Sequence, residues 1–179
     1  MVAPLELTHH IAATVRIAGA RRIGHGYDIP YETDAAGLLA EMARRRIAVE
    51  INLTSNAITP GIVGPAHPLA LYRAAGVPVT LSADDEGVFR IDLTHEYVRA
   101  VVEQKLGYRD LKEIARNGLE YSFVAGQSLW QGRRLSQTRR ALRRRRAWRG
   151  AAAAGLRRVP GRQREGGAAM GVRGTDRRL

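Results

Sequence analysis

The chain of 179 residues contains no cysteine. Without thiols it can form neither a disulfide framework nor a zinc site built from thiolates. It also has no apolar run near the ~18 residues that a membrane helix needs. The first residues lack the basic segment followed by an apolar segment that marks a signal peptide. These absences favour a cytoplasmic protein without a membrane partner.

The net charge of +12 is confined to the last part of the chain. Residues 1–130 contain 13 Lys and Arg against 15 Asp and Glu, whereas residues 131–179 contain 16 Arg, no Lys and two acidic residues. We therefore expect two parts, an α/β domain at 1–130 and a disordered Arg-rich tail at 131–179. Arg usage without Lys, together with much Ala and Gly, is also typical of GC-rich DNA translated in the wrong reading frame.

Three short β-rich stretches predict strands over 21–24, 47–53 and 77–81. Their starts are 26 to 30 residues apart, and each stretch is followed by a helical pattern. A (β/α)₈ TIM barrel of roughly 250 residues has about 31 residues per βα unit. The alternation indicates parallel strands with right-handed crossovers. Periodicity leaves open whether these are three units of a barrel or a small open sheet.

Apolar spacing and capping residues predict the helices. Residues 54–68 are rich in Gly, Pro, Ser and Asn, so we expect a loop there. The helices are expected over 7–20, 34–46, 68–75 and 93–106, with two further short helices over 110–115 and 118–123.

Ionisable side chains follow two of the three predicted strands. His25 lies between two glycines after the first strand, and Asp84 and Asp85 follow the third. Chemistry in α/β proteins sits beyond the carboxyl ends of the strands. Adjacent carboxylates repel and favour a bound cation, so we expect His25, Asp84 and Asp85 to meet near a metal site. The alternatives are a hydrogen-bonded loop histidine and an aspartate that caps the next turn.

Other polar residues have less specific interpretations. Residues 54–56 could bind a ligand, but a turn after the second strand is the more common role. His67 and His95 precede or open predicted helices, so we expect them at the surface or in caps. His9 and His10 are adjacent on a helix and face different directions, which argues against a chelating pair.

Seven motifs in one order resemble the C-terminal part of the adenosine deaminase family. The resemblance covers about residues 10–130 and favours the barrel over the open sheet. The motifs are RIGHG at 22–26, LTSN at 53–56, HP at 67–68, AGVPVTLSADD at 75–85, DLTxEY at 92–97, ARN at 115–117 and EYSF at 120–123.

The resemblance implies a zinc-dependent hydrolase that converts adenosine or deoxyadenosine and water to inosine or its deoxy form and ammonia. By motif, Asp84 matches the family's zinc-binding aspartate and Asp85 matches the aspartate that holds N7 of the purine. His25 matches the histidine that orients and deprotonates the attacking water. The implied cofactor is Zn²⁺, and the implied partner is a small purine nucleoside.

Two parts of the family pattern are missing from the sequence. These are the His-x-His pair of the first strand and the His-Ala-Gly-Glu segment, which supply zinc ligands and the acid for N1. We therefore expect the three C-terminal βα units of a barrel, inactive alone, because catalytic zinc takes three protein ligands. The alternatives are a non-catalytic remnant and a nucleic-acid-binding protein, in which the Arg-rich tail binds phosphates. The tail residues concerned are Arg139, Arg140, the arginines at 143–146 and Trp148.

Overall fold

A three-stranded parallel sheet forms the centre of the protein. The structure is a computed structural model, and it describes residues 5–130. The strands are β1 (Arg22–Gly24), β2 (Ala48–Ile51) and β3 (Val79–Leu81), in the order β1-β2-β3. The pairing aligns Gly24 with Glu50 and Glu50 with Thr80. All three carboxyl ends therefore lie along one edge of the sheet.

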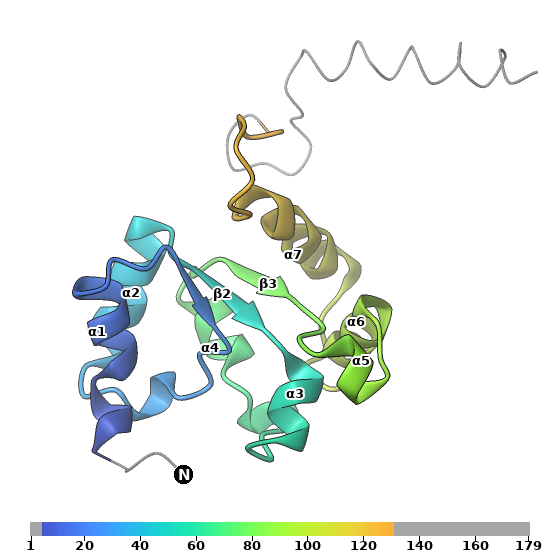
Figure 1. Cartoon of the computed structure of the whole chain (residues 1–179), viewed down its shortest axis with the longest axis horizontal. Helices are drawn as coiled ribbons and strands as arrows, with labels where there is room; N and C mark the ends of the chain where they lie inside the picture. Colours follow the sequence, from blue (N-terminus) through green and yellow to red (C-terminus); the bar gives the residue numbers. More distant parts are fainter. Residues whose placement is uncertain (1–4, 131–179) are drawn as a thin grey trace, which may run out of the picture. The chain divides into compact units, whose positions relative to one another are not determined.

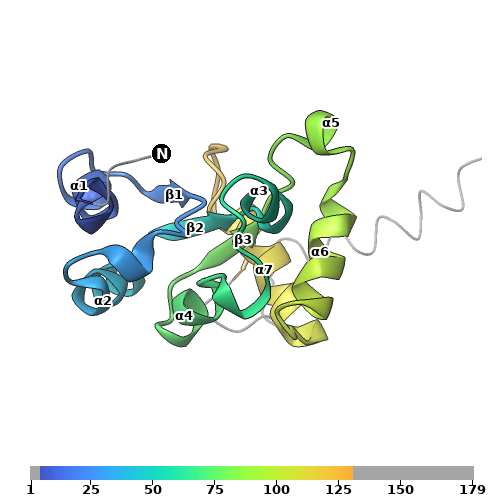
Figure 2. The same cartoon turned by 90° about the horizontal axis from the view of Figure 1, so that it is seen from below.

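Helices cover the sheet, and each strand is followed in the chain by a helix. Figures 1 and 2 show α1 and α2 beside β1, with α6 and α7 beside β3. The helices are α1 (His10–Arg16), α2 (Ala35–Arg45), α3 (Leu53–Ile58), α4 (Leu69–Ala74), α5 (Glu86–Phe89), α6 (Leu93–Val102) and α7 (Tyr108–Glu120). Three short 3₁₀ turns connect them, at Glu6–Thr8, Ile29–Tyr31 and Gly64–Ala66. None of the helices between residues 5 and 130 has the length and apolar content needed to cross a bilayer.

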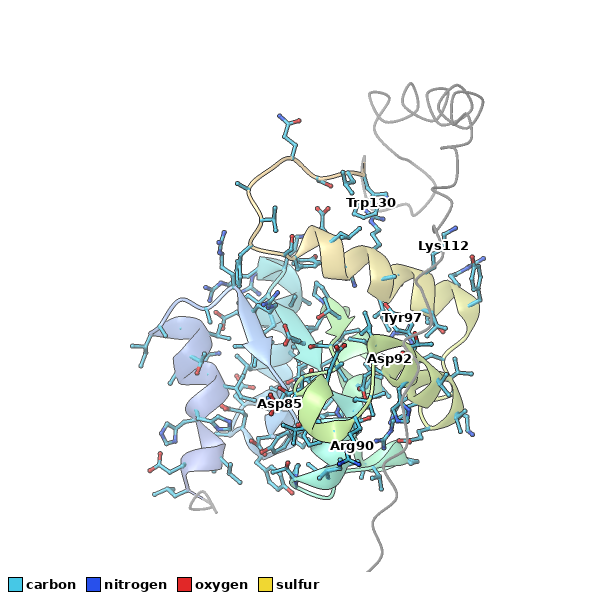
Figure 3. The ribbon with its side chains drawn as sticks, turned by 45° about the vertical axis from the view of Figure 1, so that its right-hand side comes forward. Asp85, Arg90, Asp92, Tyr97, Lys112 and Trp130 are labelled. Carbon is cyan, nitrogen blue, oxygen red and sulfur yellow. The ribbon has the colours of Figure 1, made fainter. Side chains whose placement is uncertain are left out.

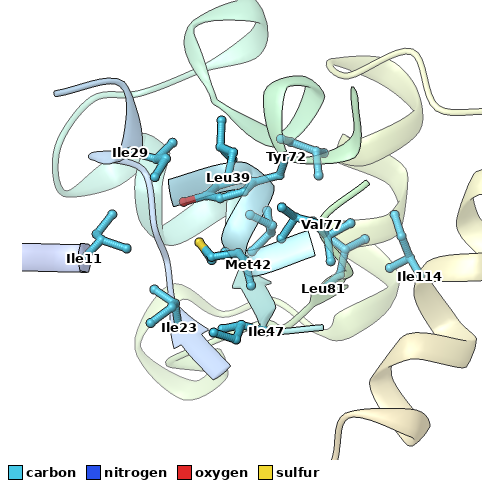
Figure 4. Close-up of a cluster of buried hydrophobic side chains, with 14 of the residues drawn as sticks. Ile11, Ile23, Ile29, Leu39, Met42, Ile47, Tyr72, Val77, Leu81 and Ile114 are labelled. Atoms are coloured by element: carbon cyan, nitrogen blue, oxygen red, sulfur yellow. The ribbon is translucent and has the colours of Figure 1, made fainter. Parts of the chain in front are cut away.

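The core lies between the sheet and its helices (Figure 4). Helix α2 illustrates how the sequence builds it, because Leu38, Leu39 and Met42 are buried on one face at helical spacing. The side chain of Asp34 caps this helix by accepting from the backbone N–H of Gly37 at 2.9 Å. The central strand β2 is buried on both faces, as expected for a parallel strand covered by helices.

Most of the expected elements are confirmed, two expectations are wrong and one is confirmed only in part. The strands, α2 and the start of α6 lie where the pattern placed them. The predicted loop at 54–68 contains the helix α3, and the two short helices predicted at 110–115 and 118–123 are the single helix α7. The helix predicted over 7–20 is a 3₁₀ turn followed by α1, which ends at Arg16. The Arg-rich tail at 131–179 lies outside the described residues.

Candidate functional site

The candidate site lies at the carboxyl ends of the strands. The backbone N–H of His25 donates to the carbonyl of Glu50 at 2.8 Å, and that of Ser82 donates to Ile51 at 3.0 Å. These two bonds continue the sheet ladder past the ends of β1 and β3. They therefore hold the segments that carry His25 and Asp84 on either side of β2.

His25 and Asp84 converge as the sequence predicted. His25 Nε2 lies 3.6 Å from Asp84 Oδ2, and both side chains are partly exposed. Both residues have left-handed backbone, with φ of 60° at His25 and 55° at Asp84. Non-glycine residues rarely adopt this backbone conformation, and those that do are often found at functional sites. The chain therefore turns sharply at the end of β1 and again after β3.

Asp85 occupies a different position from Asp84. It is exposed and lies at the start of α5 (Figure 3), where its backbone carbonyl accepts from the N–H groups of Val88 and Phe89. Its side chain makes no capping bond to that helix, so the predicted alternative of a side-chain cap is not what the structure shows. The structure thus brings His25 and Asp84 together, whereas Asp85 is exposed at the start of α5.

Close packing behind His25 fixes the turn that follows it. Gly26 has φ of 60°, and a Cβ at this position would lie 2.6 Å from the hydroxyl oxygen of Tyr72. That hydroxyl donates to the carbonyl of Gly26 at 2.7 Å. Burial raises the pKa of the Tyr72 phenol, which is enclosed in the core. Only glycine fits here, because it combines the positive φ with the close approach.

A chain of side-chain hydrogen bonds reaches the other ring nitrogen of His25. The amide nitrogens of Asn56 and Asn52 lie 3.1 Å and 3.2 Å from His25 Nδ1. Asn56 Oδ1 lies 3.0 Å from His67 Nε2, and the backbone N–H of Leu69 donates to His67 Nδ1 at 3.1 Å. His67 is 2% exposed, so the expectation of a surface position is wrong, while its capping role at α4 is confirmed.

Helix α3, which carries Asn56, is anchored from α6. The carboxylate of Glu96, fully buried, accepts from the N–H groups of Leu53 at 2.6 Å and Thr54 at 3.1 Å. Arg99 adds a bond from Nη1 to Thr54 Oγ1 at 3.2 Å. A carboxylate at the first N–H groups of a helix satisfies donors that the helix itself leaves unpaired. Residues 54–56, expected in a turn, therefore lie in a helix whose start is held from α6, and this helix places Asn56 beside His25.

The described residues do not complete a metal site. Between residues 5 and 130 no three His, Asp or Glu side chains are grouped so that they could hold a metal ion. Asp84 and His25 offer two donors, whereas catalytic zinc takes three protein ligands. His9, His10 and His95 lie elsewhere on the surface; His10 faces Asp28 and Glu32 at 3.5 Å and 3.7 Å. The remaining donors that the resemblance implies are not among these residues.

Comparison with known proteins agrees with this geometry. A family model described as adenosine deaminase matches residues 6–130. The chain is 41% identical over 106 residues to aminodeoxyfutalosine deaminase of Streptomyces coelicolor, covering 59% of this chain and 27% of that protein. It is 38% identical over 110 residues to adenosine deaminase of Shewanella loihica, covering 60% and 32%. The chain thus spans between a quarter and a third of the length of these curated relatives.

A solved structure shows the same fold in a larger protein. An amidohydrolase from Burkholderia ambifaria, solved with bound Zn, superposes with a TM-score of 0.56 at 20% identity. The match covers 81% of this chain and 36% of that one. At this identity the likeness concerns the fold, a parallel sheet with helices, and not the chemistry.

Proposed function

Because the chain belongs to the adenosine deaminase family, we propose that it carries part of the active site of a hydrolytic deaminase acting on a 6-aminopurine nucleoside. The observation that carries the proposal is the convergence of His25 and Asp84 at 3.6 Å from the two outer strands of the described sheet. This convergence occurs at the strand edge where α/β enzymes bind their substrates.

Each of the three site residues has a separate task in this proposal. His25 holds the attacking water through its ring Nε2, which faces Asp84. Asp84 would supply one ligand of a zinc ion, for which the described residues provide no complete set. Asp85, exposed at the start of α5, holds the purine ring at N7.

The described unit is proposed to be the last three βα units of a (β/α)₈ barrel. The three strands are parallel and in chain order, as consecutive barrel strands are. The family match ends at residue 130, which supports a boundary between the deaminase-like part at 1–130 and the Arg-rich tail at 131–179. Because a single carboxylate and one histidine do not hold catalytic zinc, we expect the 179-residue chain alone to be inactive.

Adenosine or deoxyadenosine is the proposed substrate. The two curated relatives differ in substrate by name, one acting on adenosine and one on aminodeoxyfutalosine. Both names describe loss of an amino group, so deamination is the common element. A panel of adenosine, deoxyadenosine, free adenine and AMP separates recognition of the nucleoside from recognition of the base or nucleotide.

A chimeric protein tests the proposal. Residues 6–130 of this chain replace the matching segment of the Shewanella loihica adenosine deaminase, and inosine formation is followed with zinc present. We expect turnover that falls at least 100-fold in Asp84→Ala and Asp85→Ala, in line with the usual effect of removing a group that acts on the transition state. Glu86→Gln, at the exposed carboxylate that follows Asp85 as the first residue of α5, is the matched control and retains activity.

Two results would contradict the proposal. The first is a chimera that folds and binds zinc but deaminates none of the panel. The second is activity that survives both aspartate substitutions. Stoichiometric zinc and adenosine turnover in the isolated 179-residue chain would instead contradict the expectation that it is inactive alone.

A further inference from the structure

The hydrogen bonds behind His25 have a fixed direction, set by one backbone group. The N–H of Leu69 can only donate, and it donates to His67 Nδ1 at 3.1 Å. His67 Nδ1 therefore carries no proton, and the single proton of this neutral imidazole lies on Nε2. His67 Nε2–H must then donate to its neighbour at 3.0 Å, which is the Oδ1 of Asn56.

The direction passes through Asn56 to His25. With Oδ1 facing His67, the amide of Asn56 can present only its NH₂ group to His25 Nδ1, at 3.1 Å. His25 Nδ1 must therefore accept a hydrogen bond and carry no proton. The proton of the neutral His25 ring lies on Nε2, the nitrogen that faces Asp84.

We infer that His67 and Asn56 are positioning residues that fix His25 in the Nε2–H tautomer, so that His25 presents a hydrogen-bond donor to the active-site edge. Which ring nitrogen is protonated is set by the partner of the other one. Here that partner is anchored by a backbone N–H two bonds away.

Asn52 follows this arrangement and does not set it. Its amide nitrogen also lies near His25 Nδ1, at 3.2 Å. Its Oδ1 is buried without a hydrogen-bond partner among the residues that the structure describes. No second bond therefore holds the Asn52 amide in one orientation, whereas the Asn56 amide is held by His67.

The surroundings of His67 keep it neutral, which preserves the direction of the relay. Burial, and to a smaller extent the positive charge of Arg99, lower the pKa of His67 to about 4. Glu103 acts in the opposite direction, and His25 adds a small lowering effect. A neutral His67 keeps the unprotonated Nδ1 that the N–H of Leu69 requires.

This inference rests on the proposed function for the role of His25 and sharpens it. Of the two tasks that the family resemblance gives this residue, orienting the attacking water and removing its proton, the tautomer supports the first. Nε2–H can donate to the water oxygen. A protonated Nε2 has no lone pair that could accept a proton from the water, and the lone pair of Nδ1 is already bonded to Asn56.

The test measures the tautomers directly in the full 179-residue chain, without metal or substrate. Histidine rings are labelled with ¹⁵N, and long-range ¹H–¹⁵N spectra at about pH 8, above the ordinary histidine pKa of about 6.5, separate pyridine-like from pyrrole-like nitrogens. We expect Nδ1 to be pyridine-like and Nε2 pyrrole-like in both His25 and His67. Single substitutions assign the five histidines.

Three variants distinguish the relay from the intrinsic preference of a free imidazole. Asn56→Asp places a carboxylate oxygen against His25 Nδ1, and we expect that nitrogen to shift to pyrrole-like. His67→Leu releases the amide of Asn56, so His25 should show a mixture of tautomers. His67→Gln retains one acceptor and one donor and should restore the wild-type His25 spectrum. His95→Gln, at an exposed histidine, is the control and should leave His25 unchanged.

Several outcomes would overturn the inference. They are a pyrrole-like Nδ1 in wild-type His25, an unchanged His25 in Asn56→Asp, and free-imidazole signals for His25 in the wild-type chain. If His67→Leu does not fold, Asn56→Asp and His67→Gln decide. Loss of turnover in the chimeric deaminase bears on the proposed function alone, because the tautomers are read without catalysis.

Discussion

The burial of His67 makes the stability of this protein depend on acid in a defined window. In the unfolded chain His67 binds a proton near the ordinary histidine pKa of 6.5, but in the folded protein its pKa is lowered to about 4. Between these values the unfolded state holds more protons, so the free energy of unfolding falls as the pH falls. The contribution is complete above about pH 6.5 and lost by about pH 4. At about 1.4 kcal/mol per pKa unit, the loss is about 3 kcal/mol.

The His67→Gln variant isolates this effect. Urea unfolding is followed by circular dichroism at several values between about pH 7 and pH 4, the window set by the two pKa values. Asp and Glu titrate in wild type and variant alike, so their effect cancels in the difference. We expect the wild type to lose about 3 kcal/mol more than His67→Gln over this range, while His95→Gln follows the wild type. Parallel curves for wild type and His67→Gln would refute the reasoning.

Two further predictions concern the bonds that hold the site in place. Glu96→Ala leaves the buried N–H groups of Leu53 and Thr54 without acceptors, and we expect the free energy of unfolding, measured in urea, to fall by about 2–5 kcal/mol. Glu96→Gln keeps one acceptor oxygen, so its free energy of unfolding should fall less. Equal losses in the two variants would argue against the capping role. Tyr72→Phe removes the donor to the carbonyl of Gly26, and we expect the free energy of unfolding, measured by thermal unfolding, to fall by about 1–2 kcal/mol. An unchanged stability would show that this bond is not formed in solution.

The sequence predicted the parts of the fold that depend on local pattern. The strands and α2 follow from β-branched runs, apolar periodicity and the cap at Asp34. Helix α3 was missed because its Thr, Ser and Asn composition is typical of a turn. Its first N–H groups are satisfied by Glu96, which is 43 residues from Leu53 in the sequence. A contact between residues so far apart in the sequence cannot be predicted from the local pattern around α3.

The prediction of two separate helices in place of α7 was wrong for a different reason. Gly118 weakens a helix by about 1 kcal/mol, which suggests a boundary when the sequence is considered alone. In the structure Asn117, its neighbour, donates from Nδ2 to the carbonyl of Val79 at 3.0 Å, and α7 packs along β3. Tertiary packing of this kind outweighs the propensity of one residue.

The candidate site was predicted in part. His25 and Asp84 were identifiable because each follows a strand and parallel strands end at one edge. Asn52 and His67 were missed as members of the site, and for residues 54–56 a turn was preferred to ligand binding, since these roles depend on hydrogen bonds across separate elements. The available signal was a histidine immediately before a proline at a helix start, a position that suits a buried cap as well as a surface residue.

The left-handed backbone at His25 and Asp84 has a consequence for protein engineering. A residue with a Cβ is disfavoured in this conformation by roughly 1 kcal/mol, and glycine is not. A redesign that optimised thermostability alone would therefore favour glycine at both positions and delete the two side chains that meet at the strand edge. Keeping histidine and aspartate at these two positions is therefore a trade-off between the stability of the protein and its chemistry.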